Sequence, residues 1–336
     1  MLYLRDIFGQ ESAIAQIRQA WQADRLPHGL IFAGPAGVGK GTTAQAMAAW
    51  FLCEKPGADD ACGHCPSCHL ITSGTHPDYH VIYRHLIRLD KKKKDSKAQS
   101  LSIDLIRDYL LEPASRKAMQ GRGKVFVVEE ADLMTRDAAN SMLKTLEEPQ
   151  GRSLIILLTD QPHSLLPTIL SRCQLARFAA LPDEIVMRHL ASRGVDEQTA
   201  MLAAKIAEGS LGLAARWSED GVVAAAGQLR ARVDAMLAGR AVEDLPAFLA
   251  AAGADYAQKQ EDRDGSISKD QANREAVVLY MRLAADHLRV RLAETDDALL
   301  QLRMCRMIDD LAQAQMYVEG NVNVNLVLEH IANRLA

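Results

Sequence analysis

The sequence predicts an α/β fold in which a parallel sheet carries a phosphate-binding loop and is followed by a helical C-terminal region. Five short runs of apolar and β-branched residues have the length and composition of strands in a sheet that is covered on both faces. These runs are residues 30–33, 78–83, 124–128, 154–158 and 175–178. The motif GPAGVGK at residues 34–40 directly follows the first run, as it does in P-loops. From Leu181 onward the sequence becomes rich in alanine and leucine, which favours helices.

The composition places the chain among soluble globular proteins. Its 336 residues indicate two or three domains, and 48% are hydrophobic while 24% are charged. The net charge of −4 argues against a histone-like nucleic-acid binder. No apolar run reaches the roughly 18 residues of a membrane-spanning helix, and residues 1–6 lack the features of a signal peptide. We therefore expect a cytoplasmic location.

The glycine-rich turn at residues 34–39 precedes a predicted helix over residues 43–52. Such a turn forms an anion cradle, because free backbone N–H groups and the positive end of the helix dipole face the phosphate. Lys40 adds a positive charge, but Gly41 stands where a Ser or Thr hydroxyl would hold Mg²⁺. Thr42 does not replace it, since successive helical residues point about 100° apart. The candidate nucleotide-binding residues are Gly34, Gly37, Gly39, Lys40, Gly41 and Thr42.

A cysteine cluster follows that helix. Two interlocking CxxC units with one cysteine upstream suit a tetrahedral zinc site, and no position remains for water, so the metal is expected to be structural. The four predicted ligands are Cys53, Cys62, Cys65 and Cys68. His64 and His69 are possible substitute ligands. The alternative, a group of free surface thiols, is less favoured by this spacing.

Two glutamates end the predicted strand at residues 124–128. Glu129 stands where P-loop ATPases place the Asp of the Mg²⁺ shell, and Glu130 stands where they place the base that activates water. The longer side chain of Glu129 would displace the metal contact. Two solvated acids at a strand end are the weaker alternative, because the pair lies about 90 residues after a P-loop. Thr159, after the strand at 154–158, is the candidate γ-phosphate sensor.

Helices are predicted between and after the strands. Ile14, Ile17 and Trp21 recur at helical spacing near the N-terminus. Ser102 is expected to cap a helix that stops near Pro113. Further helices are predicted from Thr135 to Leu146, over residues 184–193 and 196–208, and through the rest of the chain except for a polar loop at 258–271 and a turn at 321–325.

One face of a late helix is predicted to belong to the hydrophobic core. Apolar residues recur there at helical spacing, namely Leu302, Cys305, Ile308, Ala312 and Met316. Cys305 is therefore expected to be buried and unreactive.

A run of four lysines, Lys91–Lys94, lies in a polar stretch. A solvated loop is the preferred interpretation of such a run, and contact with DNA phosphates is the alternative.

Several motifs together resemble the clamp-loader branch of the AAA+ ATPases. The resemblance is carried by residues 32–40, the cysteine cluster, the stretch KTLEEP at 144–149 and the stretch TILSRC at 168–173. The resemblance rests on many motifs over residues 1–215. Beyond residue 215 it is weak and concerns mostly the predicted helical architecture. It implies an AAA+ P-loop domain at 1–179 with a zinc module at about 53–70, a helical lid domain at 180–214, and a helical collar domain at 215–336 that assembles a five-membered ring.

The same resemblance implies a role for Arg172. In this family the arginine of the Ser-Arg-Cys motif reaches the ATP of a neighbouring subunit, where a guanidinium stabilises charge that develops on the γ-phosphate. An ion pair with a carboxylate of its own domain is the alternative, and the match over residues 168–173 favours the first interpretation.

Three departures from the family argue against ATP hydrolysis by this chain. Gly41 removes the Mg²⁺-binding hydroxyl, and Glu129 replaces the usual Asp. Gly212 ends the turn Gly209-Ser-Leu-Gly212, where motor subunits carry a phosphate-sensing arginine. Arg216, one turn later, could substitute only with rearrangement.

The leading hypothesis is a clamp-loader subunit of the DNA polymerase III holoenzyme. It would complete the ring that loads a sliding clamp onto primed DNA, and it would supply Arg172 in trans without hydrolysing ATP. The implied partners are the ATPase (tau/gamma) and delta subunits, the clamp and, through the complex, primed DNA, with no membrane. The implied cofactors are structural Zn²⁺ and a bound ATP or ADP. The alternatives are an active motor subunit of the same machine, a zinc-dependent nucleic-acid-binding module and, least favoured, a nucleoside kinase.

Overall fold

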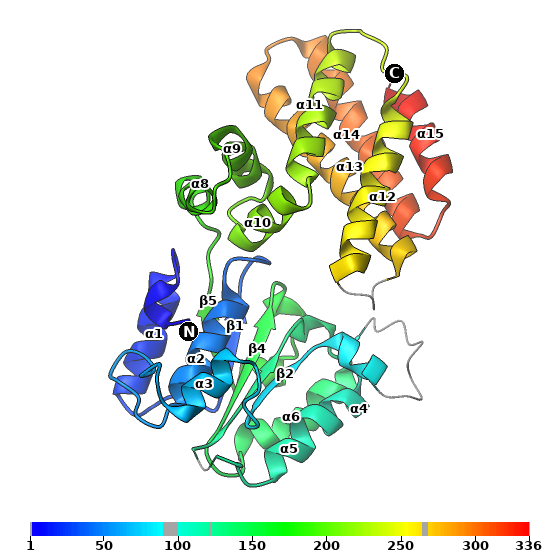
Figure 1. The fold of residues 1–336 in the computed structure, drawn as a ribbon. Coiled ribbons are helices and arrows are strands. Elements are labelled where there is room, and N and C mark those ends of the chain that lie inside the picture. Colours follow the sequence, from blue (N-terminus) through cyan, green and yellow to red (C-terminus); the bar gives the residue numbers. More distant parts are fainter. Residues whose placement is uncertain (1, 90–99, 121, 264–267, 336) are drawn as a thin grey trace. The chain divides into compact units, whose positions relative to one another are not determined.

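The computed structural model describes residues 2–89, 100–120, 122–263 and 268–335 (Figure 1). They divide into two compact units, Met1–Val186 with Glu208–Leu213 and Met187–Ala207 with Ala214–Ala336. The division into three domains stays a prediction. Among the described helices, none combines the length and apolar character that crossing a membrane requires.

The first unit is built on a parallel sheet with the strand order β2-β3-β4-β1-β5 (Figure 1). The strands are β1 (Gly29–Ala33), β2 (Tyr79–Ile82), β3 (Lys124–Val128), β4 (Ser153–Thr159) and β5 (Gln174–Arg177). In register, Ala33 lies opposite both Thr159 of β4 and Arg177 of β5. All five predicted strands are confirmed. Because the strands are parallel, their carboxyl ends share one edge of the sheet, and both the P-loop and the glutamates that follow β3 lie at this edge.

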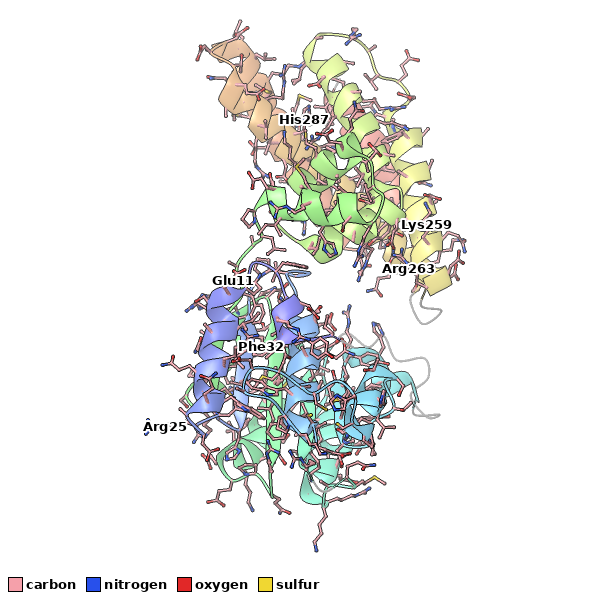
Figure 2. All side chains as sticks on the ribbon, turned by 60° about the vertical axis from the view of Figure 1, so that its left-hand side comes forward. Glu11, Arg25, Phe32, Lys259, Arg263 and His287 are labelled. Atoms are coloured by element: carbon pink, nitrogen blue, oxygen red, sulfur yellow. The ribbon has the colours of Figure 1, made fainter. Side chains whose placement is uncertain are left out.

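Both faces of the sheet are buried, as the continuous apolar strands predict. Phe32 of β1 packs with residues of helices α1 to α3 on one face (Figure 2). Its neighbour Ile31 packs with residues of helices α4 to α6 on the other face. The alternation follows from the two-residue repeat of a strand, and it confirms the predicted α/β class.

The helices of the first unit largely match the prediction. They are η1 (Leu4–Asp6), α1 (Glu11–Gln22), α2 (Lys40–Leu52), α3 (Pro66–Thr72), η2 (Arg84–Leu89), α4 (Ile103–Ile106), the π-helical turn η3 (Arg107–Leu111), α5 (Glu112–Ser115), η4 (Ala131–Leu133), α6 (Arg136–Glu147), η5 (Pro162–Ser164) and α7 (Pro167–Leu170). The Ser102 side chain accepts the Leu105 N–H at 3.4 Å, which confirms the predicted cap. The helix ends at Ser115, two residues beyond Pro113, which agrees with the predicted stop near Pro113. Pro113 lies in the first turn of α5, directly after the π-turn, where its missing N–H interrupts no regular ladder.

The second unit is helical. Its elements are part of α8 (Asp183–Ser192), α9 (Glu197–Ile206), most of α10 (Leu211–Glu219), α11 (Val222–Leu237), α12 (Leu245–Arg263), α13 (Lys269–Glu294), α14 (Ala298–Glu319) and α15 (Val324–Leu335). The polar loop predicted at 258–271 is too long, since α12 continues to Arg263 and α13 begins at Lys269. The predicted turn before the last helix is confirmed.

A buried carboxylate joins α12 to the end of α10 within this unit. Asp220 is 2% exposed and accepts hydrogen bonds from Gln260 Nε2 at 3.0 Å and Arg263 Nη1 at 2.8 Å. Lys259 Nζ donates to the Asp220 carbonyl at 2.7 Å. Figure 2 labels Lys259 and Arg263 on α12. A buried charge needs such partners, so the network fixes the start of the helical bundle.

The predicted core face of α14 is wrong. Leu302 and Met316 are 51% and 64% exposed, and Cys305 is exposed as well. The buried residues of α14 are Met304, Met307, Leu311, Ala314 and Val318. The predicted residues and the buried residues both recur at helical spacing. Helix α14 packs against α13 and α15, and the buried set faces the core. Tertiary packing, which periodicity does not encode, selects between them.

A buried histidine links the first unit's stability to pH. His76 is 4% exposed; its Nδ1 accepts the Asp78 N–H at 3.1 Å, and its Nε2 lies 3.0 Å from Ser67 Oγ. Ser67 donates to the Leu52 carbonyl at 2.8 Å, so the ring is neutral with its proton on Nε2. Burial lowers the pKa of His76, and the nearby Asp78 opposes this only in part.

Acidification should therefore destabilise the fold. Below about pH 6.5 the unfolded state binds a proton more readily than folded His76 does, so the free energy of unfolding should decrease as the pH drops from 7.5 towards 5.5. Urea unfolding at pH 7.5, 6.5 and 5.5 measures this. His76→Gln should flatten the dependence, whereas the exposed His163→Gln should not; equal slopes in all three proteins would refute the assignment.

Candidate functional site

The P-loop lies at the carboxyl end of β1, next to the end of β4. The Gly34 N–H donates to the Thr159 carbonyl at 3.2 Å. A Cβ atom on Gly34 would lie 2.1 Å from the Phe178 carbonyl oxygen, and Gly37 has φ +71° with Ser210 Oγ 2.2 Å from its ideal Cβ position. These positions therefore require glycine, and they bring the loop against the end of the sheet.

The P-loop lysine contacts its own loop. Lys40 Nζ donates to the carbonyls of Gly34 at 2.5 Å and Pro35 at 2.6 Å. Burial lowers the pKa of Lys40, while the charges of Asp160 and Asp132 act in the opposite direction. The ammonium therefore satisfies main-chain acceptors of the cradle into which a phosphate would enter.

The hydroxyl groups at the start of α2 do not restore a Mg²⁺ ligand. Gly41 has none, and Thr42 is exposed. Thr43 Oγ1 donates to the Gly39 carbonyl at 2.8 Å and is buried. The first turn of α2 thus lacks a hydroxyl at the position that the P-loop motif requires.

The turn at Gly209–Gly212 packs on the P-loop within the first unit. The Gly212 N–H donates to the Gly37 carbonyl at 2.8 Å. A Cβ atom on Gly212 would lie 3.1 Å from Gly37 Cα. In the sequence, Gly212 stands where motor subunits carry a phosphate-sensing arginine. The structure adds that a side chain at position 212 would crowd the P-loop backbone. Arg216 belongs to the second unit.

The acidic end of β3 is engaged in contacts of its own. Glu130 has φ +50° and ψ +46°, and its carboxylate pairs with Arg84 Nε at 3.1 Å. Burial, and then the neighbouring charge of Glu130, raises the pKa of Glu129. Both glutamates thus follow the carboxyl end of β3, at the same edge of the sheet as the P-loop, and Glu130 is paired with Arg84.

Two acids near the cradle were missed at the level of the sequence. Thr159 Oγ1 donates to Asp132 Oδ1 at 2.6 Å and accepts the Gln161 N–H at 3.0 Å. Asp132 and Asp160 both act on the charge of Lys40. Asp160 directly follows Thr159, and Asp132 lies two residues after Glu130. Their proximity in the sequence to predicted site residues was the signal that could have revealed them.

Arg172 lies at the other end of β1. Gly29 is the first residue of β1. A Cβ atom on Gly29 would lie 2.6 Å from Cys173 Sγ, 3.1 Å from Leu146 Cδ2 and 3.5 Å from the Arg172 carbonyl oxygen. The P-loop begins after Ala33, and four strand steps span about 13 Å. The Ser-Arg-Cys motif therefore belongs to the opposite edge of the sheet from the cradle of the same chain.

The guanidinium of Arg172 is held by an ion pair with its own domain. Its Nε donates to Glu147 Oε1 at 2.6 Å, and Nη2 contacts the same oxygen. Its Nη1 donates to the Thr168 carbonyl at 3.0 Å and lies 3.3 Å from Ser171 Oγ. In the isolated chain, Arg172 therefore makes the ion pair with a carboxylate of its own domain that was considered as the alternative.

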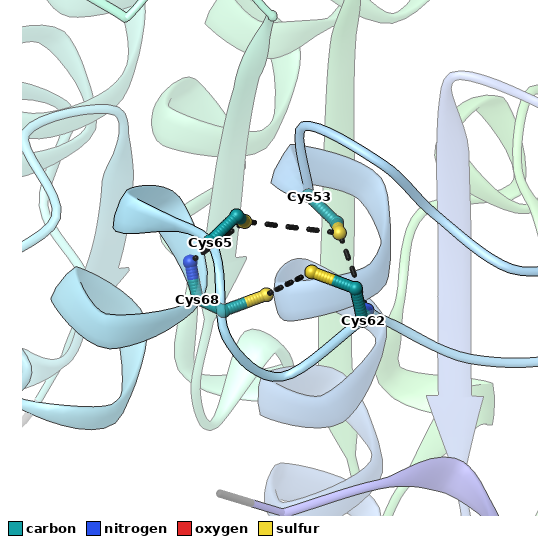
Figure 3. Close-up of side chains that lie close together, drawn as sticks. All are labelled: Cys53, Cys62, Cys65 and Cys68. Atoms are coloured by element: carbon teal, nitrogen blue, oxygen red, sulfur yellow. Dashed lines mark hydrogen bonds between the residues drawn. The ribbon is translucent and has the colours of Figure 1, made fainter.

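The four cysteines form one group (Figure 3). Their sulfur atoms lie within 4.8 Å of one another, and the pairs Cys53–Cys65 and Cys62–Cys68 are each 3.9 Å apart. Four thiolates around a zinc ion at about 2.3 Å would lie about 3.8 Å apart. The residues therefore fit a closed tetrahedral zinc site.

Local structure aims these sulfurs at one point. Cys53 follows the last residue of α2, and Cys65 is the N-cap of α3, whose first residue is Pro66. His64 and His69 are exposed and stand outside the group found in the described residues. Burial raises the pKa of Cys53 and Cys68. At Cys62 the effect of burial is outweighed by hydrogen bonds from the backbone of His64 and Cys65, which lower its pKa to about 6. Binding a metal releases protons from those thiols that are still protonated.

The cysteine loop is anchored to neighbouring elements. Trp50 Nε1 donates to the Gly57 carbonyl at 3.0 Å. Asp60 is 8% exposed and accepts the N–H groups of Leu4 at 3.0 Å and Arg5 at 3.3 Å. The loop therefore joins the end of α2 to the N-terminal segment. The lysine run at 91–94 lies outside the described residues.

A P-loop at the carboxyl edge of a five-stranded parallel sheet, with acids after β3 and a polar residue ending β4, defines an α/β P-loop domain. The family model described as DNA polymerase III, delta subunit, matches residues 9–182. The chain belongs to this family.

Named relatives agree. The chain is 40% identical over 146 residues to DNA polymerase III subunit delta′ of Pseudomonas aeruginosa, covering 44% of this chain and 41% of the relative. It is 35% identical over 196 residues to the Escherichia coli protein of the same name, covering 58% and 55%. It is also 31% identical over 239 residues to E. coli DNA polymerase III subunit tau, covering 69% and 35%. The chain thus spans about half the length, or less, of the curated relatives it matches.

Proposed function

We propose that this chain is a clamp-loader subunit of the DNA polymerase III holoenzyme that supplies Arg172 to the ATP site of a neighbouring subunit and does not hydrolyse ATP itself. The observation that carries the proposal is the separation along β1. Arg172 lies at the amino end of this strand and the P-loop lies at its carboxyl end. An arginine so far from its own cradle is suited to serve an ATP bound elsewhere.

The state of the cradle supports the second half of the proposal. Lys40 donates to carbonyls of its own loop, Glu130 is paired with Arg84, and position 41 lacks a hydroxyl. Hydrolysis needs a Mg²⁺ ligand and a base that orients water. A site in which both functions are weakened is better suited to holding ATP or ADP than to cleaving it.

The partners follow from the family. We infer that the chain assembles with the ATPase (tau/gamma) and delta subunits, that the complex opens a sliding clamp on primed DNA, and that it works in the cytoplasm. The lid region at 180–214 and the collar at 215–336 would contribute to the ring. Cys53, Cys62, Cys65 and Cys68 would hold a structural Zn²⁺, whose binding energy would contribute to folding.

An active motor subunit of the same machine is the second candidate. The similarity to tau and the intact Lys40 favour it.

Nucleotide titration of the purified chain separates the two candidates. Because position 41 offers no Mg²⁺ ligand, ATP binding should differ by less than about twofold with and without Mg²⁺, and turnover should stay at the level of a blank. Isothermal titration and a phosphate-release assay measure these quantities. Mg²⁺-dependent turnover would favour the motor subunit and refute the proposal.

A further inference from the structure

The two most specific motifs of the sequence meet in the structure. Leu146 of KTLEEP and Cys173 of TILSRC both pack at Gly29, where a Cβ atom would collide with them. Leu146 is 4% exposed, and burial raises the pKa of the Cys173 thiol to about 12. These two side chains therefore act as apolar anchors. The residues adjoining the anchors in the chain, Glu147 and Arg172, form the ion pair.

We propose that Glu147 is the positioning residue of Arg172: it fixes the guanidinium in one orientation so that an ordered arginine is presented to the neighbouring ATP. This inference rests on the proposed function. The Glu147 carboxylate contacts the edge of the guanidinium that is formed by Nε and Nη2. The Thr168 carbonyl holds Nη1 on another side.

The location of Glu147 needs a reason beyond local stability. It is the last residue of α6, where the helix dipole is negative and a carboxylate is unfavourable. Its side chain is 47% exposed and that of Arg172 is 33% exposed, and pairs this exposed contribute little to folding. A carboxylate at the end of α6 does, however, restrict the orientation of the Arg172 side chain.

Ordering matters because an arginine side chain is flexible. An arginine that is disordered before the reaction must lose its rotamer freedom as the transition state forms. Groups that are already oriented avoid this cost, which is the basis of electrostatic preorganisation. Glu147 therefore should affect kcat, through Arg172, and leave the binding of ATP to the neighbour unchanged.

The test is a double-mutant cycle in the reconstituted clamp loader with clamp and primed DNA. Glu147→Ala should lower the kcat of ATP hydrolysis at the site served by Arg172 about five- to tenfold, with KM changed less than twofold. Glu147→Gln, which keeps an oxygen acceptor, should recover part of the loss. Glu148→Ala is the matched control, since Glu148 adjoins Glu147 at the end of α6, and it should leave kcat unchanged.

The Arg172→Ala background distinguishes positioning from a structural role. If Glu147 acts through Arg172, adding Glu147→Ala there should have no further effect. A further loss in that background, or an unchanged or raised kcat in the single variant, would overturn the inference.

A second readout keeps the inference separable from the proposed function. In the isolated chain, phenylglyoxal should modify Arg172 several-fold faster after Glu147→Ala, and modification of the exposed Arg193 should not change. An equal rate at Arg172 in both proteins would overturn positioning. If this rate rises but Arg172→Ala leaves ATP hydrolysis unchanged, the proposed function fails while the ordering by Glu147 stands.

Discussion

Replacing Arg172 with alanine should slow ATP hydrolysis at the neighbouring site by about 10³-fold. An arginine finger stabilises charge on the γ-phosphate in the transition state and contributes 10³ to 10⁵ to kcat in related phosphoryl transfers. Total hydrolysis by the complex would fall less, because other sites in the ring keep their own residues. The measurement is DNA-stimulated phosphate release by the reconstituted complex, together with its rate of clamp loading.

Two variants control this result. Arg172→Lys keeps the charge but loses the planar fork that addresses two oxygens, so it should recover only a small part of the rate. Arg193→Ala removes an exposed arginine elsewhere and should have no effect. Normal assembly by Arg172→Ala with unchanged hydrolysis and loading would refute the role in trans.

Removing the metal from the cysteine cluster should destabilise the first unit by several kcal/mol. Structural zinc contributes its binding energy to folding. Arg122 also contacts the backbone at the end of α2, since it donates to the Cys53 carbonyl through Nε at 3.1 Å and Nη2 at 2.7 Å. A loss of about 5 kcal/mol corresponds to a fall in Tm of roughly 10 to 20 °C for a unit of this size.

Metal analysis and thermal unfolding test this expectation. The purified chain should contain one zinc per molecule, and Cys62→Ser should lower both the zinc content and the Tm. Cys305→Ser changes an exposed thiol outside the cluster and should change neither. A chain without zinc that unfolds at the same temperature before and after chelation would show that the cluster is not a metal site.

Much of the fold could be predicted from the sequence because its signals are local. The five strands are apolar runs buried on both faces, and the P-loop and the cysteine spacing are short motifs whose geometry is set by neighbouring residues. The cap at Ser102 is likewise a contact across three residues.

Apart from helix boundaries, the errors and omissions concern contacts between distant residues. On α14 the sequence contains two apolar stripes, and only packing against α13 and α15 decides that Met304 is buried while Met316 is exposed. The pairs Arg84–Glu130 and Arg172–Glu147 join residues 46 and 25 positions apart. Spacing alone does not reveal such pairs, so the state of the candidate site could be described only from the structure.

The central claim is that the residue acting on ATP is Arg172 and not the chain's own acidic pair. The most direct test compares Glu130→Gln and Arg172→Ala, each incorporated into the reconstituted complex, by DNA-stimulated ATP hydrolysis. Glu130→Gln should leave the rate unchanged because the chain's own site does not hydrolyse ATP, whereas Arg172→Ala should lower it. A loss with Glu130→Gln and none with Arg172→Ala would contradict the account.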